Sequence, residues 1–382
     1  MKSGFWIVAA TFLVAMAFST VPTPLWPLYQ AVDGFPTSMV TVAFSAYAIG
    51  VLISLFLAGH VSDWVGRRRV LLPGVLLEVL SATLFLSGHA LPLLIVARVV
   101  CGFGIGLITA TATAHLAELA PGTRRAGHVA TAANLGGLGL GPLVSGFLAQ
   151  YVSGPLTTVY VVFLVLLVSS ALAIGLVPET VTATSRRYRP QRVSVPRPHR
   201  RRYAVTAAGA FTAFALFGLF TSLTPKILSA SVGTTSAALA GAVTAVVFLA
   251  GVLAQLWSGR LDLGRQLTAG VAALVAGVVA LLLAGVAGSL VLFVVAGALA
   301  GAGAGLLFKG AMGSAARMAE PTARGEAAAG IFLAGYVGLT LPVLGLGAAA
   351  RWVSLTTGLT AFCLVILVVL TGVGLQLRAL RA

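Results

Sequence analysis

Charged residues are scarce in this chain of 382 residues. Asp, Glu, Lys and Arg together account for 8% of the sequence, whereas 59% of its residues are hydrophobic. Soluble globular domains contain about 25% charged residues, so the composition excludes a water-soluble globule. Runs of about 20 apolar residues can cross the hydrocarbon core of a bilayer. The shortage of charge therefore indicates a protein that lies mostly within a membrane.

Cysteine is almost absent, and histidine is dispersed. The two cysteines, Cys101 and Cys363, fall singly within long apolar stretches and form no CxxC pair, which argues against a metal site or a disulfide framework. The five histidines are scattered along the chain, whereas an intramembrane enzyme needs clustered catalytic groups. We therefore expect no metal, no bound cofactor and no enzymatic activity.

Twelve apolar segments are long enough to span a bilayer. They predict an all-α membrane protein of two six-helix bundles, residues 1–177 and 204–382. Between them, residues 178–203 carry eight arginines and several prolines, which we interpret as a mobile, basic cytoplasmic linker. The predicted spans are 5–29, 38–60, 70–88, 91–115, 127–151, 155–177, 204–228, 235–258, 267–287, 289–314, 326–349 and 354–377.

The net charge of +16 raises the question of a nucleic-acid partner. The basic residues do not support one, because most lie in the loops and chain ends on one side of the predicted membrane. Only Lys226 and Arg351 fall on the other side, and Arg98 and Lys309 lie within spans. This is the positive-inside pattern, and it predicts a multi-pass protein of the cytoplasmic (inner) membrane with both termini in the cytoplasm.

The N-terminal segment allows a second interpretation. Lys2, the apolar run that follows it and the triplet Ala15-Met16-Ala17 resemble a secretory signal peptide. Because apolar sequence continues to Pro22 and beyond, the stretch is long enough to span the membrane. We therefore favour a first transmembrane helix.

Glycine and proline residues occur at matching positions in the two halves when one half is shifted by 200 positions. Gly59 then aligns with Gly259, and Pro142 aligns with Pro342. An even number of spans in each half means that both halves begin and end on the same side. The pattern therefore predicts parallel repeats, related by an axis along the membrane normal, with a cavity between them.

A charged turn, GHVSDWVGRRR, joins the second and third predicted helices. The spacing of Gly59, Asp63, Gly66 and Arg67 resembles the loop at this position in major facilitator superfamily transporters. Trp64 departs from the family pattern, which usually has a basic residue there. The resemblance implies a carrier that works by alternating access.

The same resemblance implies a conformational latch on the cytoplasmic side. Asp63 would face the N-terminus of the eleventh helix, which begins near Arg324 and presents unpaired N–H groups. Arg67 would bind the acid that ends the fourth helix, for which Glu118 is the candidate. The alternative is a basic turn that sets topology and has no latch role.

Two further helices are similar to family signatures. Arg98 and the glycines that follow it are similar to an RxxxG pattern of the fourth helix. The fifth helix resembles the GxxxGPxxGG signature of drug and proton antiporters, and it would seal the cavity during transport. Its small residues would also let a neighbouring helix approach closely, so helix packing without directional meaning is the alternative. The signature residues are Gly137, Gly141, Pro142 and Gly146.

Charges deep in the membrane are candidates for proton coupling, because each costs about 2.5–3.5 kcal/mol at the centre of a helix. Glu78 is the only acid placed near mid-membrane, and Arg98 on the next helix is within reach of it. The two would form either a fixed pair or a pair that breaks when Glu78 takes up a proton. Many proton-coupled relatives carry an acid in the first helix and this chain has none there, which leaves the coupling ion open. Lys309 is expected to extend to the lipid headgroups.

Candidates for the substrate cavity follow from the resemblance, which implies that the first, fourth, seventh and tenth helices surround the substrate. Thr109 and Thr113 share one helix face by their spacing. Phe214 and Phe217 form part of an aromatic stripe, for which lipid-facing packing is the alternative. Asn134 is the last candidate for the cavity. The alternative role for its side chain is an interhelical hydrogen bond.

The combined prediction is a monomeric secondary active transporter with a small-molecule substrate and the lipid bilayer as its partners. It would export amphipathic or hydrophobic, drug-like compounds in exchange for protons, as multidrug efflux antiporters do. The alternative is an uptake or facilitative permease for a small metabolite such as a sugar or an organic acid.

Overall fold

The computed structural model describes residues 2–184, 188–195, 199–320 and 323–379, and these residues form helices and loops without a strand. The chain divides into two compact units, and each is described by itself. Unit 1 comprises Met1–Pro36, Val42–Gln191 and Ala237–Gly241, and unit 2 comprises Thr37–Thr41, Arg192–Ser236 and Ala242–Ala382.

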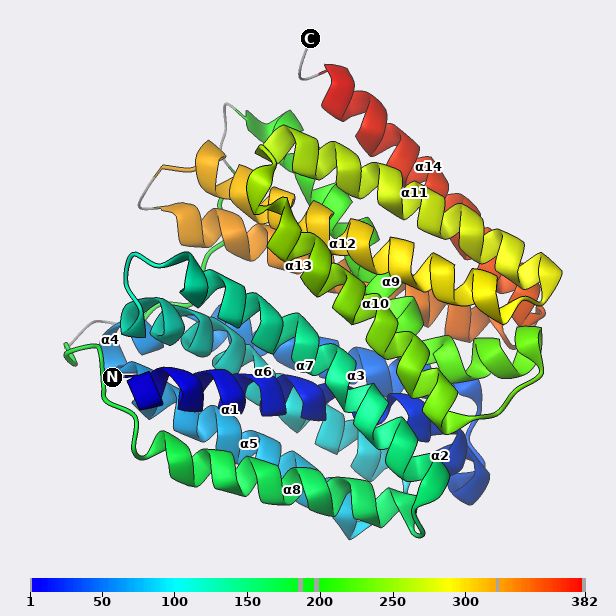
Figure 1. The fold of residues 1–382 in the computed structure, drawn as a ribbon, viewed down its shortest axis with the longest axis horizontal. Helices are drawn as coiled ribbons and strands as arrows, with labels where there is room; N and C mark the ends of the chain where they lie inside the picture. The colour runs from blue at the N-terminus through cyan, green and yellow to red at the C-terminus, as the bar shows by residue number, and fades with distance from the viewer. Residues whose placement is uncertain (1, 185–187, 196–198, 321–322, 380–382) are drawn as a thin grey trace. The chain divides into compact units, whose positions relative to one another are not determined.

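Twelve helical segments in the described residues are long and apolar enough to cross a membrane, which confirms the predicted number of spans. The first half of the chain (Figure 1) contains α1 (Lys2–Thr20), η1 (Thr23–Leu25), α2 (Trp26–Asp33), α3 (Thr37–Ala58), α4 (Ser62–Val65), α5 (Arg67–Ser87), α6 (Leu91–Leu119), α7 (Arg124–Tyr151) and α8 (Pro155–Ile174). The second half contains α9 (Arg200–Ile227), η3 (Leu228–Val232), α10 (Ala237–Trp257), η4 (Ser258–Arg260), α11 (Leu263–Ala287), α12 (Leu290–Met318), α13 (Arg324–Ala349) and α14 (Leu355–Ala379).

Local sequence explains where several helices begin and end. Pro155 occupies the first position of α8, where its missing N–H has no intrahelical partner to lose. The Asp262 carboxylate accepts a hydrogen bond from the Arg265 N–H (2.8 Å) and caps α11. Gly288 ends α11 with a φ of 61°, a left-handed conformation that favours glycine. These signals keep the loops between spans short.

The packing inside unit 1 is repeated inside unit 2. In unit 1, α1 packs against α6, α7 and α8, and α5 packs against α6 and α8. In unit 2, α9 packs against α12, α13 and α14, and α11 packs against α12 and α14. These are the same pairs once the helices of each unit are counted from its start. The internal repeat predicted from the sequence is therefore present in the packing.

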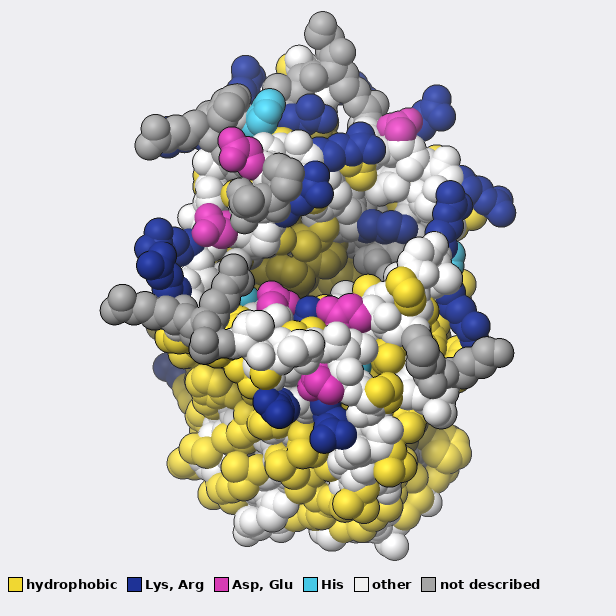
Figure 2. Space-filling view, turned by 90° about the vertical axis from the view of Figure 1, so that its left-hand side faces the viewer, with side chains coloured by type: hydrophobic (Ala, Val, Ile, Leu, Met, Phe, Trp, Pro, Cys, Tyr) yellow, Lys and Arg dark blue, Asp and Glu magenta, His cyan; other side chains and the backbone are white. Residues whose placement is uncertain are grey.

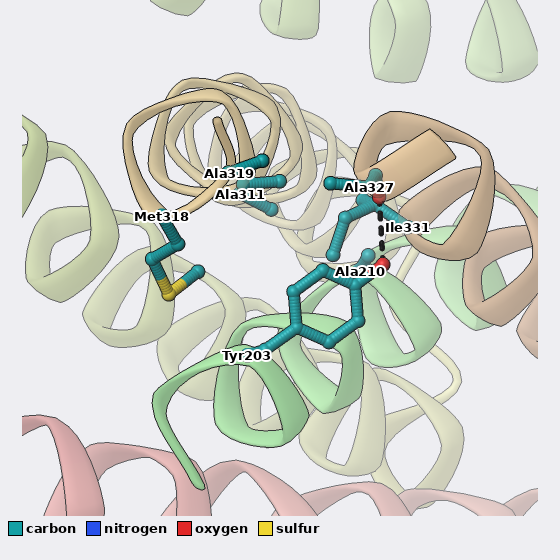
Figure 3. Close-up of a cluster of buried hydrophobic side chains, with 8 residues drawn as sticks. Tyr203, Ala210, Ala311, Met318, Ala319, Ala327 and Ile331 are labelled. Atoms are coloured by element: carbon teal, nitrogen blue, oxygen red, sulfur yellow. Dashed lines mark hydrogen bonds between the residues drawn. The ribbon is translucent and has the colours of Figure 1, made fainter. Parts of the chain in front are cut away.

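Small side chains allow close helix contacts in unit 2. A buried cluster joins α9, α12 and α13 (Figure 3), and most of its members are alanines. The Tyr203 hydroxyl reaches across from α9 and donates a hydrogen bond to the Ala327 carbonyl (2.6 Å). The cluster consists of Tyr203, Ala210, Ala311, Ala315, Met318, Ala319, Ala327 and Ile331.

Candidate functional site

The charged turn between α3 and α5 folds into one short helix, α4, followed by Gly66. The φ of Gly66 is 120°, a conformation that side chains with a Cβ rarely adopt. The sharp turn places Arg67 at the start of α5, where its side chain is buried although its neighbours Arg68 and Arg69 are exposed. Gly59, at the end of α3, donates its N–H to the Leu55 carbonyl (3.1 Å).

Arg67 is the centre of a charge network. Its Nη2 lies 2.7 Å from Oε1 of Glu118, and its Nε also donates to that carboxylate (3.1 and 3.2 Å). Its Nη1 donates to Oδ1 of Asp63 (2.5 Å) and to Oγ of Ser62 (2.7 Å). Such forked contacts between a guanidinium and a carboxylate are among the stronger hydrogen bonds in proteins. The structure thus joins Arg67 and Glu118 as the sequence suggested.

Arg324, the remaining residue of the predicted latch, is exposed at the start of α13 in unit 2. Its predicted neighbour, Asp63, belongs to unit 1. The contact between Asp63 and the start of α13 stays a prediction, and so does the latch role of the whole set.

The sequence interpretation missed two residues of the network, Glu179 and Thr180. The Glu179 carboxylate accepts the backbone N–H groups of Arg67 (2.7 Å) and Arg68 (3.1 Å). The Thr180 hydroxyl donates to Oε2 of Glu118 (2.5 Å). Glu179 therefore caps α5, whose first turn contains three arginines and no acid. That uncapped basic start was the available signal, because helix N-termini favour an anionic partner.

The described part of the linker contacts unit 1 further along the chain. Thr184 donates its N–H to the Trp64 carbonyl (3.0 Å), and Gln191 donates its N–H to the Phe56 carbonyl (2.8 Å). The Tyr188 hydroxyl donates to the Leu57 carbonyl (2.9 Å), and its ring stacks on His60. Linker residues thus satisfy two of the unpaired carbonyls at the end of α3. Unit 1 therefore includes the linker residues up to Gln191.

Glu78 and Arg98 are both buried in unit 1, but they do not form the predicted ion pair. Arg98 Nη1 instead donates to the Ser19 carbonyl on α1 (2.6 Å), and its guanidinium carbon lies 4.3 Å from the centre of the Tyr47 ring on α3. The Glu78 carboxyl group lies close to the Cys101 thiol and to the Ile105 backbone N–H, both of which are uncharged. Arg98 does not pair with Glu78 because α1 and α3 supply a carbonyl and an aromatic ring that hold its guanidinium.

The antiporter-like helix α7 packs tightly against α1. A Cβ on Gly137 would lie 2.6 Å from the Leu13 carbonyl oxygen, and one on Gly141 would overlap the Ala17 carbonyl oxygen. Pro142 has no N–H to give to the Leu138 carbonyl, and the Thr20 hydroxyl donates to that carbonyl instead (3.0 Å). The helices therefore fit through small residues and one replacement hydrogen bond.

The last residue of that signature, Gly146, faces another helix. A Cβ on it would overlap the carbonyl oxygen of Ala237, which begins α10 and belongs to unit 1. The signature residues therefore pack against two different helices.

The predicted cavity residues have different surroundings. Thr109 is half-buried and its hydroxyl lies 3.8 Å from the Met16 sulfur, whereas Thr113 is exposed. Asn134 on α7 is half-buried. Phe217 is buried and stacks on Phe248 with ring centres 4.9 Å apart.

Phe214 is half-buried and belongs to an aromatic group in unit 2. Its ring centre lies 4.9 Å from that of Phe308 and 5.6 Å from that of Tyr336. Lys309, next along α12, donates its Nζ proton to the Gln255 carbonyl in the last turn of α10 (2.6 Å). Its ammonium therefore contacts the end of a helix, and the expected reach toward the lipid headgroups stays a prediction.

The helices, their repeated packing and the buried charged groups indicate the class of protein. In the described residues, twelve helices that are long and apolar enough to cross a membrane fall into two units with the same internal packing. Charged groups are buried at the start of α5 and in the middle of unit 1. Repeated bundles of this kind are typical of secondary transporters.

Comparison with known proteins identifies the family. Residues 7–229 match the Major Facilitator Superfamily, and the chain belongs to that superfamily. Members of this superfamily are membrane transporters and not enzymes.

Curated relatives resemble only part of the chain. The quinolone resistance protein NorA of Staphylococcus aureus is 27% identical over 142 residues, which cover 36% of this chain and 36% of NorA. An uncharacterised MFS-type transporter of Mycobacterium tuberculosis is 31% identical over 143 residues, which cover 37% of this chain and 21% of that protein. The chain thus matches about a third or less of the length of these relatives.

Solved structures resemble the whole fold. The transporter PepTSo of the POT family superposes with a TM-score of 0.80 at 12% identity and covers 99% of this chain and 98% of its own. The human organic anion transporter MFSD10 gives a TM-score of 0.71 at 18% identity, with 97% of this chain and 99% of that chain covered. At these identities the comparison shows the fold alone.

Proposed function

We propose that the protein exports amphipathic or hydrophobic, drug-like molecules in exchange for protons. Glu78 carries this proposal, because its side chain is fully buried and no cation in the described residues forms an ion pair with it. A charged carboxylate without a partner is costly in such surroundings. Glu78 therefore carries a proton in this state and releases it when the transport cycle brings water or a cation to it. The proton gradient drives transport, and the proposal includes no bound cofactor.

The type of substrate is inferred from two observations. The chain resembles a protein named for quinolone resistance. In addition, Phe214, Phe308 and Tyr336 form an aromatic group in unit 2. Aromatic side chains favour flat apolar molecules, whereas phosphates and sugars need cationic or polar partners. Both observations support an aromatic, weakly polar substrate.

The proposed orientation follows from the basic residues. The turn that contains α4 marks one end of the helices in unit 1. Figure 2 looks at the side of unit 1 that carries this turn, and the helices α5 and α7 begin with arginines, residues 67–69 and 124–125. Positive charge is retained on the cytoplasmic side of a membrane. We therefore assign this face and both termini to the cytoplasm, in the inner membrane, and we propose that the monomer is the working unit.

The test of proton coupling is transport by the Glu78→Gln variant. Everted membrane vesicles that contain the wild-type protein should accumulate a fluorescent quinolone when their lumen is acidified. Glu78→Gln should abolish this accumulation, because glutamine cannot bind and release a proton. Glu320→Gln is the matched control, because Glu320 is exposed in a loop of unit 2.

Unchanged accumulation by Glu78→Gln, at equal expression, would remove Glu78 from the mechanism. Wild-type vesicles that accumulate no compound from a broad panel on acidification would contradict export.

A further inference from the structure

A buried polar cluster extends through unit 1 from Glu78 toward the end of the unit opposite the charged turn. Its members come from four helices, and each side chain is at most 3% exposed. We use the name buried polar cluster for Tyr29 on α2, Glu78 on α5, Arg98 and Cys101 on α6, and Tyr160 on α8.

The members of the buried polar cluster are neighbours of one another. The Cys101 thiol lies beside the Glu78 carboxyl group, and Arg98 is close enough to act on both electrostatically. Arg98 also acts on the Tyr160 hydroxyl, which lies next to the hydroxyl of Tyr29. Electrostatic interactions therefore link the polar groups of the cluster from α5 to α2.

The buried polar cluster has more hydrogen-bonding capacity than its protein partners use. Nε of Arg98 has no hydrogen-bond partner in the described residues. The oxygens of Glu78, Tyr29 and Tyr160 can form more hydrogen bonds than their contacts with Cys101, with Ile105 and between the two tyrosines use. Buried polar groups are nearly always hydrogen-bonded. Water that is buried among such groups typically makes about three hydrogen bonds to them, so several of these atoms can share one molecule.

A buried tyrosine of unit 2 provides a comparison. Tyr203 is also buried, at 5% exposure, but its hydroxyl donates to the Ala327 carbonyl (Figure 3). It therefore has a partner in the protein and needs no water.

The buried polar cluster ends close to the surface. The Tyr29 ring centre lies 5.9 Å from the ring centre of His89, which is half-buried in the loop between α5 and α6. Glu78 lies nine residues before Ser87, the last residue of α5, which corresponds to about 14 Å along the helix. Arg98 lies seven residues after Leu91, where α6 begins beyond that loop, and it is therefore closer than Glu78 to the same end.

We infer that the buried polar cluster holds water molecules and conducts protons between the His89 end of unit 1 and Glu78. The inference rests on the proposed proton coupling, and it adds the route. At each step a water or tyrosine hydroxyl accepts one proton and gives up another to its neighbour. The transferred proton finally bonds to a carboxylate oxygen of Glu78, and no group is oxidised or reduced.

Arg98, Tyr29 and Tyr160 each have a specific role in this proton route. Arg98 is held by the Ser19 carbonyl and the Tyr47 ring, so it stays beside Glu78 and balances the carboxylate when the proton leaves. Tyr29 and Tyr160 are positioning residues, because their hydroxyls connect the water molecules. The Phe85 ring stacks on Tyr160 with centres 4.6 Å apart and fixes its direction.

The presence of water can be tested on the purified wild-type protein by X-ray radiolysis, which produces hydroxyl radicals from bound water. Oxidation measured by mass spectrometry should be faster at Tyr29 and Tyr160 than at Tyr203, although all three are buried. Oxidation at Tyr29 and Tyr160 that is no faster than at Tyr203 would overturn the inference.

The route can be tested with Tyr29→Phe and Tyr160→Phe, with Tyr203→Phe as the control. Proton-driven quinolone transport should slow about tenfold in the first two variants, equal to about 1.4 kcal/mol in the barrier. Exchange of labelled for unlabelled quinolone at equal pH on both sides should keep its wild-type rate, because it needs no net proton transfer.

The outcomes separate the route from the proposed function. Equal slowing of both processes would indicate a structural role, and unchanged rates would indicate another route; either result overturns the inference. A wild-type protein that transports quinolone without moving protons would refute the proposed function itself. Should the variants fail to fold, the radiolysis result on the wild-type protein decides.

Discussion

Replacing Arg67 with alanine should be among the most destabilising changes at the charged turn. The guanidinium makes three contacts with Glu118 and one each with Asp63 and Ser62. Its own side chain is 8% exposed, whereas the side chain of Glu118 is 33% exposed. Removal of Arg67 therefore leaves a carboxylate that water reaches only in part.

The magnitude follows from that partial exposure. Breaking a buried ion pair by removing one partner costs about 3–5 kcal/mol, and exposed pairs are worth about 1 kcal/mol or less. Because a third of Glu118 is exposed, we expect Arg67→Ala to lower the free energy of unfolding by about 3 kcal/mol, at the low end of the buried range. Arg67→Lys should recover only part of this loss, because an ammonium cannot form the forked contact.

The assay is reversible unfolding in mixed micelles, followed by tryptophan fluorescence. Arg68→Ala is the matched control, because Arg68 is exposed and its side chain donates only to the Gly175 carbonyl (3.1 Å); a surface change of this kind costs about 0.5 kcal/mol or less. A double-mutant cycle between Arg67→Ala and Glu118→Ala should give a coupling energy of about 1–2 kcal/mol.

Two results would refute the reasoning. One is a loss for Arg67→Ala no larger than that for Arg68→Ala. The other is a coupling energy within about 0.3 kcal/mol of zero, which would show that the two side chains contribute independently.

Two other variants test features that the structure revealed. Glu179→Ala should lower the free energy of unfolding by about 1 kcal/mol, the usual cost of losing a helix cap, and the exposed Glu320→Ala should not; equal losses in chemical denaturation would contradict the cap. Gly141→Val should cost about 3 kcal/mol or more through overlap with α1. Gly136→Val, which meets no neighbouring atom within 4 Å, controls for helix propensity, so similar thermal unfolding midpoints of the two valine variants would disprove tight packing at Gly141.

Hydropathy determined much of this protein before any tertiary structure was considered. A segment of about 20 apolar residues has one stable arrangement in lipid, a helix that satisfies its own backbone. The number of spans could therefore be read from the sequence. The pair Arg67 and Glu118 was suggested by family resemblance, and the structure brings these residues together.

Side-chain partners inside the units were decided by tertiary packing. Arg98 was assigned to Glu78 because the two helices are adjacent in sequence, but α1 and α3 supply a carbonyl and an aromatic ring that hold its guanidinium. Glu179 is bonded to the backbone of Arg67, 112 residues earlier. No sequence period indicates such a contact, because it depends on where two distant segments meet.

The sequence alone thus determined which residues lie in the membrane and which ends of the helices carry positive charge, because transfer free energies depend on the residues themselves. The tertiary structure alone decided which buried polar atoms find a partner: the Tyr203 hydroxyl has the Ala327 carbonyl, whereas Nε of Arg98 has none among the described residues. Hydrogen bonds need alignment within a few tenths of an ångström, and only the packing of several helices sets positions at that scale.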